Sequence, residues 1–176
     1  MREGFIVVIL LALLFLIVIG NVIRRRAASG RPGDVVRELR LQALRSKSSV
    51  LVMDIGYADA VASVVAASTG DASIYLSTGG GITGGIQHEN VRAAAIAFLH
   101  ESAAHLGDFQ RTDDFPYPAV GAVRFYAVTP EGVSFAEADE KELRDGRHPL
   151  SALYTAGHEV IAALRVSTET SEHVTS

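Results

Sequence analysis

The chain has 176 residues, no cysteine and a formal net charge of −4, and its charges are unevenly distributed. Residues 24–47 carry eight basic side chains against two acidic ones, whereas residues 48–176 carry seven basic and seventeen acidic ones. Because phosphate backbones repel an acidic domain, we expect no nucleic-acid partner for the larger part of the chain. The absence of cysteine excludes thiol catalysis and thiolate-bound zinc.

The first predicted element is an apolar segment over residues 4–23, which contains no charged side chain and is followed directly by Arg24, Arg25 and Arg26. A helix of about twenty residues is about 30 Å long, which matches the hydrocarbon core of a bilayer. The alternative is a cleaved signal peptide, with Ala28-Ser29-Gly30 as the cleavage region. The apolar core of a signal peptide is usually only about 7–15 residues long, so a retained transmembrane helix is favoured.

The arginines predict the topology of this anchor. Arg2 is the only basic residue before the apolar segment, whereas several arginines follow it. Because Lys and Arg stay on the cytoplasmic side of a membrane, we predict that the larger domain lies in the cytoplasm. We therefore expect a single-pass protein of the inner (cytoplasmic) membrane, anchored by residues 1–26, which meets lipids through residues 4–26. The excess of arginine over lysine is typical of a GC-rich bacterial genome.

After a predicted linker over residues 27–33, Asp34 is the expected N-cap of a helix that ends near Arg45. Its expected buried face carries Val35, Leu39 and Ala43. Three strands follow, over residues 50–55, 60–67 and 72–77. The last two form a hairpin, although the alanines of the middle segment also suit a helix.

The second half of the chain predicts two helices and another hairpin. In order, we expect a helix over residues 89–106, a loop over 107–118, strands over 120–128 and 133–138, a charged loop over 140–149, a helix over 151–166 and a flexible tail over 167–176. Residues 34–166 thus form an α+β domain of the order α-βββ-α-ββ-α, with a mostly antiparallel five-stranded sheet. This order is similar to small profilin-like or roadblock-like domains, which mostly bind proteins.

Five glycines in seven residues form the first candidate ligand site: Gly79, Gly80, Gly81, Gly84 and Gly85. They match the pattern G-x-G-x-x-G between a predicted strand and a helix, where free backbone amides can hold a phosphate. However, no βαβ unit is predicted around them and no lysine lies nearby, so neither the dinucleotide fingerprint nor the P-loop is complete. The alternative is that these glycines only allow a sharp turn or close packing.

Asp54 is the second candidate, because it ends an apolar run in the tripeptide Asp54-Ile55-Gly56. An apolar run of this kind, followed by a hairpin, resembles the first phosphate-binding segment of the actin, sugar-kinase and heat-shock ATPase superfamily, over residues 50–77 only. A ribonuclease-H-like arrangement, in which Asp54 and Glu89 hold Mg²⁺, is a related alternative, but the hairpin predicted over 120–138 argues against it. Without a ligand, Asp54 is a turn-capping residue at a strand end.

No other catalytic template is complete. His100 and His105 lie about 140° apart on a helix, so they cannot hold one metal ion, and His158 is also expected at the surface. The aromatic residues Tyr117, Phe125, Tyr126 and Tyr154 fill the core or form a protein-binding surface. We expect at most one of Phe125 and Tyr126 to face the core, because they alternate in a strand.

The leading hypothesis is therefore a membrane-anchored module that binds other proteins or itself, without catalysis, cofactor or metal. The alternative is a membrane-tethered enzyme or sensor that binds a phosphate or nucleotide ligand through Asp54 and the glycine segment, residues 79–85.

Overall fold

The computed structural model describes residues 31–174, and the side chains of residues 31–168. The predicted anchor and most of the predicted linker lie outside the described residues. Among the helices of the described part, none is both long enough and apolar enough to cross a bilayer.

The described chain forms an α+β domain with one seven-stranded sheet, in the order β4-β3-β2-β1-β6-β7-β5, in which all neighbours are antiparallel. Its four helices are α2 (Pro32–Leu44), α3 (Glu89–Ala103), α4 (Glu140–Arg144) and α5 (Ser151–Val174). Its strands are β1 (Val50–Gly56), β2 (Val61–Ala67), β3 (Ala72–Leu76), β4 (Gly81–Ile82), β5 (Gln110–Arg111), β6 (Ala122–Thr129) and β7 (Gly132–Asp139). Two single 3-10 turns, η1 (Gly85–Gln87) and η2 (Leu106–Asp108), flank α3.

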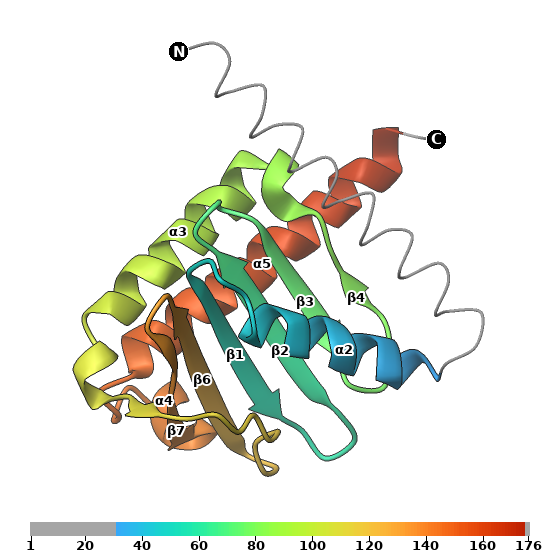
Figure 1. Ribbon diagram of the computed structural model, residues 1–176. Helices are drawn as coiled ribbons and strands as arrows, with labels where there is room; N and C mark the ends of the chain where they lie inside the picture. Colours follow the sequence, from blue (N-terminus) through green and yellow to red (C-terminus); the bar gives the residue numbers. More distant parts are fainter. Residues whose placement is uncertain (1–30, 175–176) are drawn as a thin grey trace.

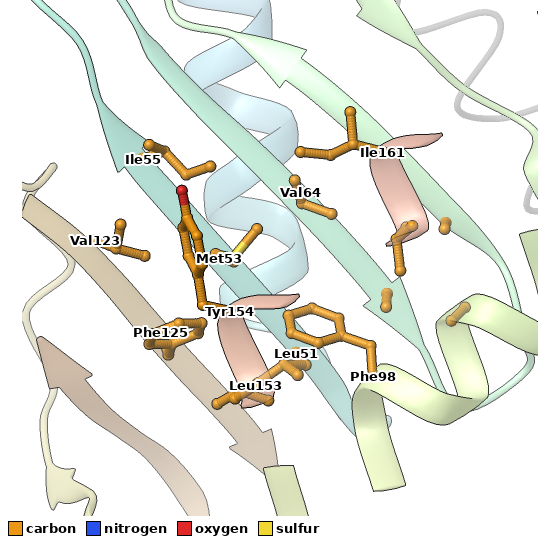
Figure 2. Packing of buried hydrophobic residues seen from close by; sticks show 14 of the residues in the cluster. Leu51, Met53, Ile55, Val64, Phe98, Val123, Phe125, Leu153, Tyr154 and Ile161 are labelled. Carbon is orange, nitrogen blue, oxygen red and sulfur yellow. The ribbon is translucent and has the colours of Figure 1, made fainter. Parts of the chain in front are cut away.

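Helices cover both faces of the sheet: α2 crosses one face, and α3 and α5 cross the other (Figure 1). The central strand β1 is therefore buried along its whole length. Because strand side chains alternate, Leu51, Met53 and Ile55 enter the core under α3 and α5, which Figure 2 shows. Val50 and Val52 enter a second, smaller core under α2.

The long predicted elements are confirmed. β1, β2 and β3 match the three predicted strands, so the helical alternative for β2 is wrong. The predicted stripe of α5 is buried, and so are four of the five predicted stripe residues of α3. The exception is Leu106, which is 41% exposed because α3 ends at Ala103.

The start and the buried face of α2 differ from the prediction. The helix begins at Pro32, two residues before Asp34, since a proline without an N–H group fits the first helical turn. Its fully buried residues are Val36, Arg40 and Leu44, one position along from the predicted face. An arginine thus occupies the centre of the buried face.

The five-stranded prediction missed β4 and β5, which are two residues long and too short to show periodicity. The charged segment predicted as a loop contains α4, whose N-cap Asp139 accepts a hydrogen bond from the backbone N–H of Glu142 at 3.1 Å. Moreover, α5 continues past the predicted end to Val174. The flexibility of the predicted tail stays a prediction.

Phe125 and Tyr126 are both fully buried, so the expectation that only one of them faces a core is wrong. The reason is that the sheet has a core on each side. Phe125 packs under α3 and α5, whereas Tyr126 packs under α2 with Val52.

Candidate functional site

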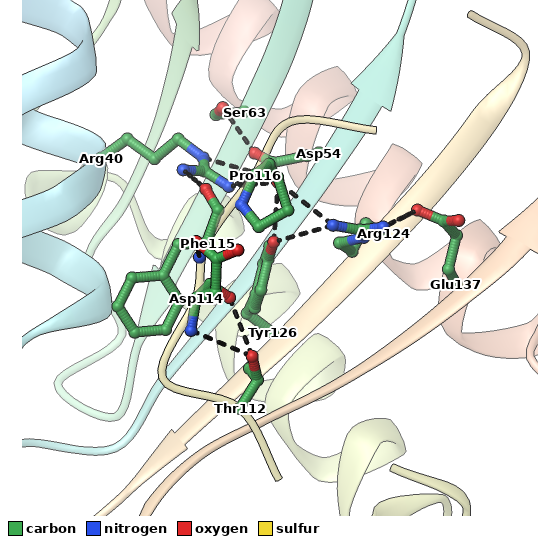
Figure 3. A network of polar contacts seen from close by, with 10 residues as sticks. All are labelled: Arg40, Asp54, Ser63, Thr112, Asp114, Phe115, Pro116, Arg124, Tyr126 and Glu137. Carbon is green, nitrogen blue, oxygen red and sulfur yellow. Dashed lines mark hydrogen bonds and ion pairs between the residues drawn. The ribbon is translucent and has the colours of Figure 1, made fainter. Parts of the chain in front are cut away.

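The main polar feature of the domain interior is an ion pair between Asp54 of β1 and Arg40 of α2. Both residues are almost completely buried, at 0% and 1% exposure. The carboxylate atom Oδ2 of Asp54 accepts hydrogen bonds from Nε of Arg40 at 2.8 Å and from Nη2 at 2.5 Å. The other oxygen, Oδ1, accepts a hydrogen bond from the hydroxyl group of Ser63 on β2 at 2.6 Å (Figure 3). Both oxygens of Asp54 are therefore engaged by protein groups.

The loop before β6 closes over this pair. Nη1 of Arg40 donates to the carbonyl oxygen of Phe115 at 2.9 Å, and the hydroxyl group of Tyr126 donates to the carbonyl oxygen of Pro116 at 2.7 Å. The ring of Tyr117 lies 4.5 Å from the guanidinium carbon of Arg40. The pair thus joins α2, β1, β2 and this loop.

Burial and pairing act in opposite directions on the two charges. Burial raises the pKa of Asp54 above its ordinary value, although the hydrogen bonds from Arg40 and Ser63 oppose this shift. Burial disfavours the charged form of Arg40, but its hydrogen bond to Asp54 leaves the pKa of Arg40 above the ordinary value. The arginine therefore stays charged, and Asp54 supplies the counter-charge that a buried guanidinium needs.

The glycine segment begins with a tight turn between β3 and β4. Gly79 and Gly80 have φ angles of 113° and 85°, which favour glycine. A Cβ atom on Gly79 would lie 2.4 Å from Cβ of Pro32, so this glycine lets the first turn of α2 approach the turn. Gly80 has open space around its Cα atom.

The remaining glycines continue into β4 and η1. A Cβ atom on Gly81 would lie 2.2 Å from the carbonyl oxygen of Ile74, and one on Gly85 would lie 2.4 Å from Cγ1 of Val91. Gly84 has a φ angle of 85° and open space. Close packing or backbone conformation therefore accounts for each glycine without a ligand.

The structure does not bring the predicted ligand-binding residues into one site. Asp54 pairs with Ser63, Ser63 with Tyr75, and Tyr75 with Gly81, so three strand spacings, about 14 Å, separate Asp54 from the glycine segment. Glu89 begins α3, which covers the opposite face of the sheet. Within residues 31–174, no cluster of three or more His, Asp or Glu side chains suits a metal ion. Ligand binding through these residues stays a prediction to which the geometry lends no support.

A polar cluster that the sequence did not predict lies where α4 meets α5. The rings of His158 and Tyr154 are 4.4 Å apart, and the hydroxyl group of Tyr154 donates to Oε1 of Glu140 at 3.1 Å. Burial, reinforced by Glu140, raises the pKa of Tyr154 to about 12. Burial lowers the pKa of His158, whose Nε2 is buried without a hydrogen-bond partner among the described residues. His158 is thus half-buried, not the surface residue that we expected.

An apolar groove of about 360 Å³ runs between the second half of α3 and the sheet end at which β1 begins and β6 ends. Ile96 and Leu106 line it and are 49% and 41% exposed. Its other lining residues are Ser49, Val50, Ser68, Leu99, His100, Ser102, Ala103, Ala127, Val128 and Thr129. Sequence reasoning missed this groove, although Ile96 falls outside the predicted buried stripe of its helix and could have signalled an exposed apolar side chain.

No protein-family model, curated protein or solved structure matches this chain. The arginines predicted at the membrane interface, Arg24, Arg25 and Arg26, lie outside the described residues.

Proposed function

We propose that the chain is a single-pass membrane protein whose α+β domain binds another protein, or a second copy of itself, without catalysis. The apolar segment over residues 4–23 supports the anchor, and the arginines after it support a domain in the cytoplasm. Lipids would meet residues 4–26, and the partner would meet the folded domain.

The observation that carries the proposal of protein binding is the groove beside α3. Exposed Ile96 and Leu106 give it an apolar lining of the kind that receives an anchoring side chain from a partner. The groove lies at the sheet end opposite Pro32, the first residue of α2. Asp54 is 0% exposed and both of its oxygens accept hydrogen bonds from protein groups, which supports the absence of catalysis by that residue.

Photo-crosslinking in native membranes tests this proposal. A benzoylphenylalanine residue at position 96 of the full chain should give a specific crosslinked product. The same residue at position 93, which is exposed on the same helix but does not line the groove, is the matched control. A product that contains two copies of the chain indicates self-association, and a product with another protein indicates a partner. Equal, diffuse labelling from both positions contradicts the proposal.

A further inference from the structure

The sheet end at which α2 begins carries exposed apolar side chains. Pro32 lies against Gly79 of the β3–β4 turn, so the first turn of α2 rests on this end. Six large hydrophobic side chains are exposed in the part of the chain whose side chains are described, and three of them, Tyr57, Leu76 and Val120, lie here. We call these three residues the apolar tip.

Strand pairing places the tip residues in a row. Leu76 ends β3, and Tyr57 follows β1 directly. Val120 precedes β6 in a loop that is held to β1 by a hydrogen bond from the N–H group of Gly121 to the carbonyl oxygen of Gly56, at 2.9 Å. From β3 to β6 there are three strand spacings, so the row is about 14 Å long. The exposures of Leu76, Tyr57 and Val120 are 40%, 45% and 69%.

The length of the chain before α2 indicates which surface lies near the apolar tip. Eight residues, 24–31, separate the apolar segment, which ends at Ile23, from Pro32. At about 3.5 Å per residue, a fully extended chain of this length covers at most about 28 Å. If residues 4–23 span the membrane, this linker keeps the start of α2 within about 28 Å of the bilayer, and the groove beside α3 lies at the other end of the sheet.

We propose that the apolar tip of Tyr57, Leu76 and Val120 rests on the lipid surface and orients the domain on the membrane. This inference rests on the proposed anchor, and it adds a second membrane contact made by the folded domain. Leu76 and Val120 supply aliphatic surface, and Tyr57 combines an aromatic ring with a polar hydroxyl group, which suits the interface.

Acidic residues at the same sheet end limit the depth of this contact. Asp59, in the β1–β2 turn beside Tyr57, is exposed, and so is Asp139, which pairs with Ala122 at the start of β6. Glu140 is also close, because its N–H group donates to the carbonyl oxygen of Gly121, beside Val120. Their carboxylates have to remain in the hydrated headgroup layer, and they oppose attraction to anionic lipids. The contact is therefore made through apolar area and does not need lipid charge.

The chain contains no cysteine, so a single substitution gives one labelling site. We would compare Val120→Cys with Ser48→Cys, an exposed position in the α2–β1 turn at the far end of the sheet. Each full-length variant carries a nitrobenzoxadiazole label and is reconstituted into phosphatidylcholine vesicles, with or without lipids that are spin-labelled near the headgroup. We expect the spin label to quench the fluorescence at position 120 several-fold more than at position 48. Adding Tyr57→Ser and Leu76→Ser to the Val120→Cys variant should remove most of this quenching.

Three outcomes would overturn the proposal. The first is equal, weak quenching at both positions, and the second is strong quenching that survives loss of the other two tip residues. The third is protection of position 120 from aqueous iodide without quenching by the lipid label, which would mean that protein covers the tip. Alkaline-carbonate extraction of the same vesicles separates these results from a failed anchor. A chain that stays in the pellet without quenching at position 120 refutes only the tip contact, whereas a chain that is released refutes the anchor itself.

Discussion

Replacing Arg40 by methionine tests whether the buried ion pair is structural. Arg40→Met keeps much of the apolar stem but removes every hydrogen bond that the guanidinium donates to Asp54 and Phe115. Asp54 is 0% exposed, so its carboxylate would be left in the interior without a counter-charge. Breaking a buried pair in this way costs about 3–5 kcal/mol, a large part of the roughly 5–15 kcal/mol by which domains are stable.

The assay is urea unfolding of the full chain in detergent, followed by far-ultraviolet circular dichroism, because the chain has no tryptophan to report by fluorescence. The control is Arg147→Met, which removes an exposed ion pair to Asp145 and should cost about 1 kcal/mol or less. The double variant Arg40→Met/Asp54→Leu removes both buried charges and should recover most of the loss.

Two results would show that the buried ion pair is not structural in this sense. If Arg40→Met lowered the free energy of unfolding by less than about 1 kcal/mol, the buried pair would not be an important structural contact. If the double variant were no more stable than Arg40→Met, an unpaired buried charge would not be the cause of the loss.

Further predictions concern the β3–β4 turn, the polar cluster around His158 and ligand binding by the glycine segment. Gly79→Ala should destabilise the domain more than Gly80→Ala in the same assay. Both glycines have positive φ angles, but only a Cβ atom on Gly79 would meet Pro32. Equal losses of stability would contradict the close contact between Pro32 and Gly79. Burial depresses the pKa of His158 below its ordinary value of 6.5, so the unfolded state binds the proton first and stability should fall as the pH drops below 6.5. His158→Gln should flatten this part of the pH profile, and an unchanged slope would show that His158 does not cause it. Inorganic phosphate or Mg²⁺-ATP should leave the unfolding temperature unchanged. A ligand that binds the folded domain, at about 100 times its Kd, would add about 2.7 kcal/mol of stability. A saturable increase in the unfolding temperature would therefore favour the phosphate-binding hypothesis.

The elements that the sequence predicted well are those with long apolar runs or clear helical periodicity. β1 is an uninterrupted apolar run apart from Asp54, and α5 shows its buried stripe plainly. The two-residue strands β4 and β5 have no such pattern, since their existence depends on neighbours that are distant in sequence. The short helix α4 depends on the cap at Asp139, which lies within a charged segment.

The buried ion pair was harder to predict, because the residue that pairs with Asp54 is determined by tertiary packing. An aspartate in a buried strand needs a counter-charge or several hydrogen-bond donors. The sequence pattern instead favoured a ligand-binding or turn-capping role for Asp54, whereas its carboxylate bonds to Arg40 and Ser63. However, Arg37, Arg40 and Arg45 all lie in or beside the same helix, and a face chosen for its hydrophobic residues leaves Arg40 out. Only the packing of α2 on the sheet identifies Arg40 as the partner. A resemblance based on the three residues from Asp54 to Gly56 could not supply this information.

We propose that residues 4–23 keep the protein tethered to a membrane. The most direct test is alkaline-carbonate extraction of membranes that contain the full chain, followed by intact-mass measurement of the protein in the pellet. We expect the pellet to contain the chain with residues 1–30 still attached. Recovery of the protein in the supernatant, or of a mature chain that begins near residue 31, would contradict it.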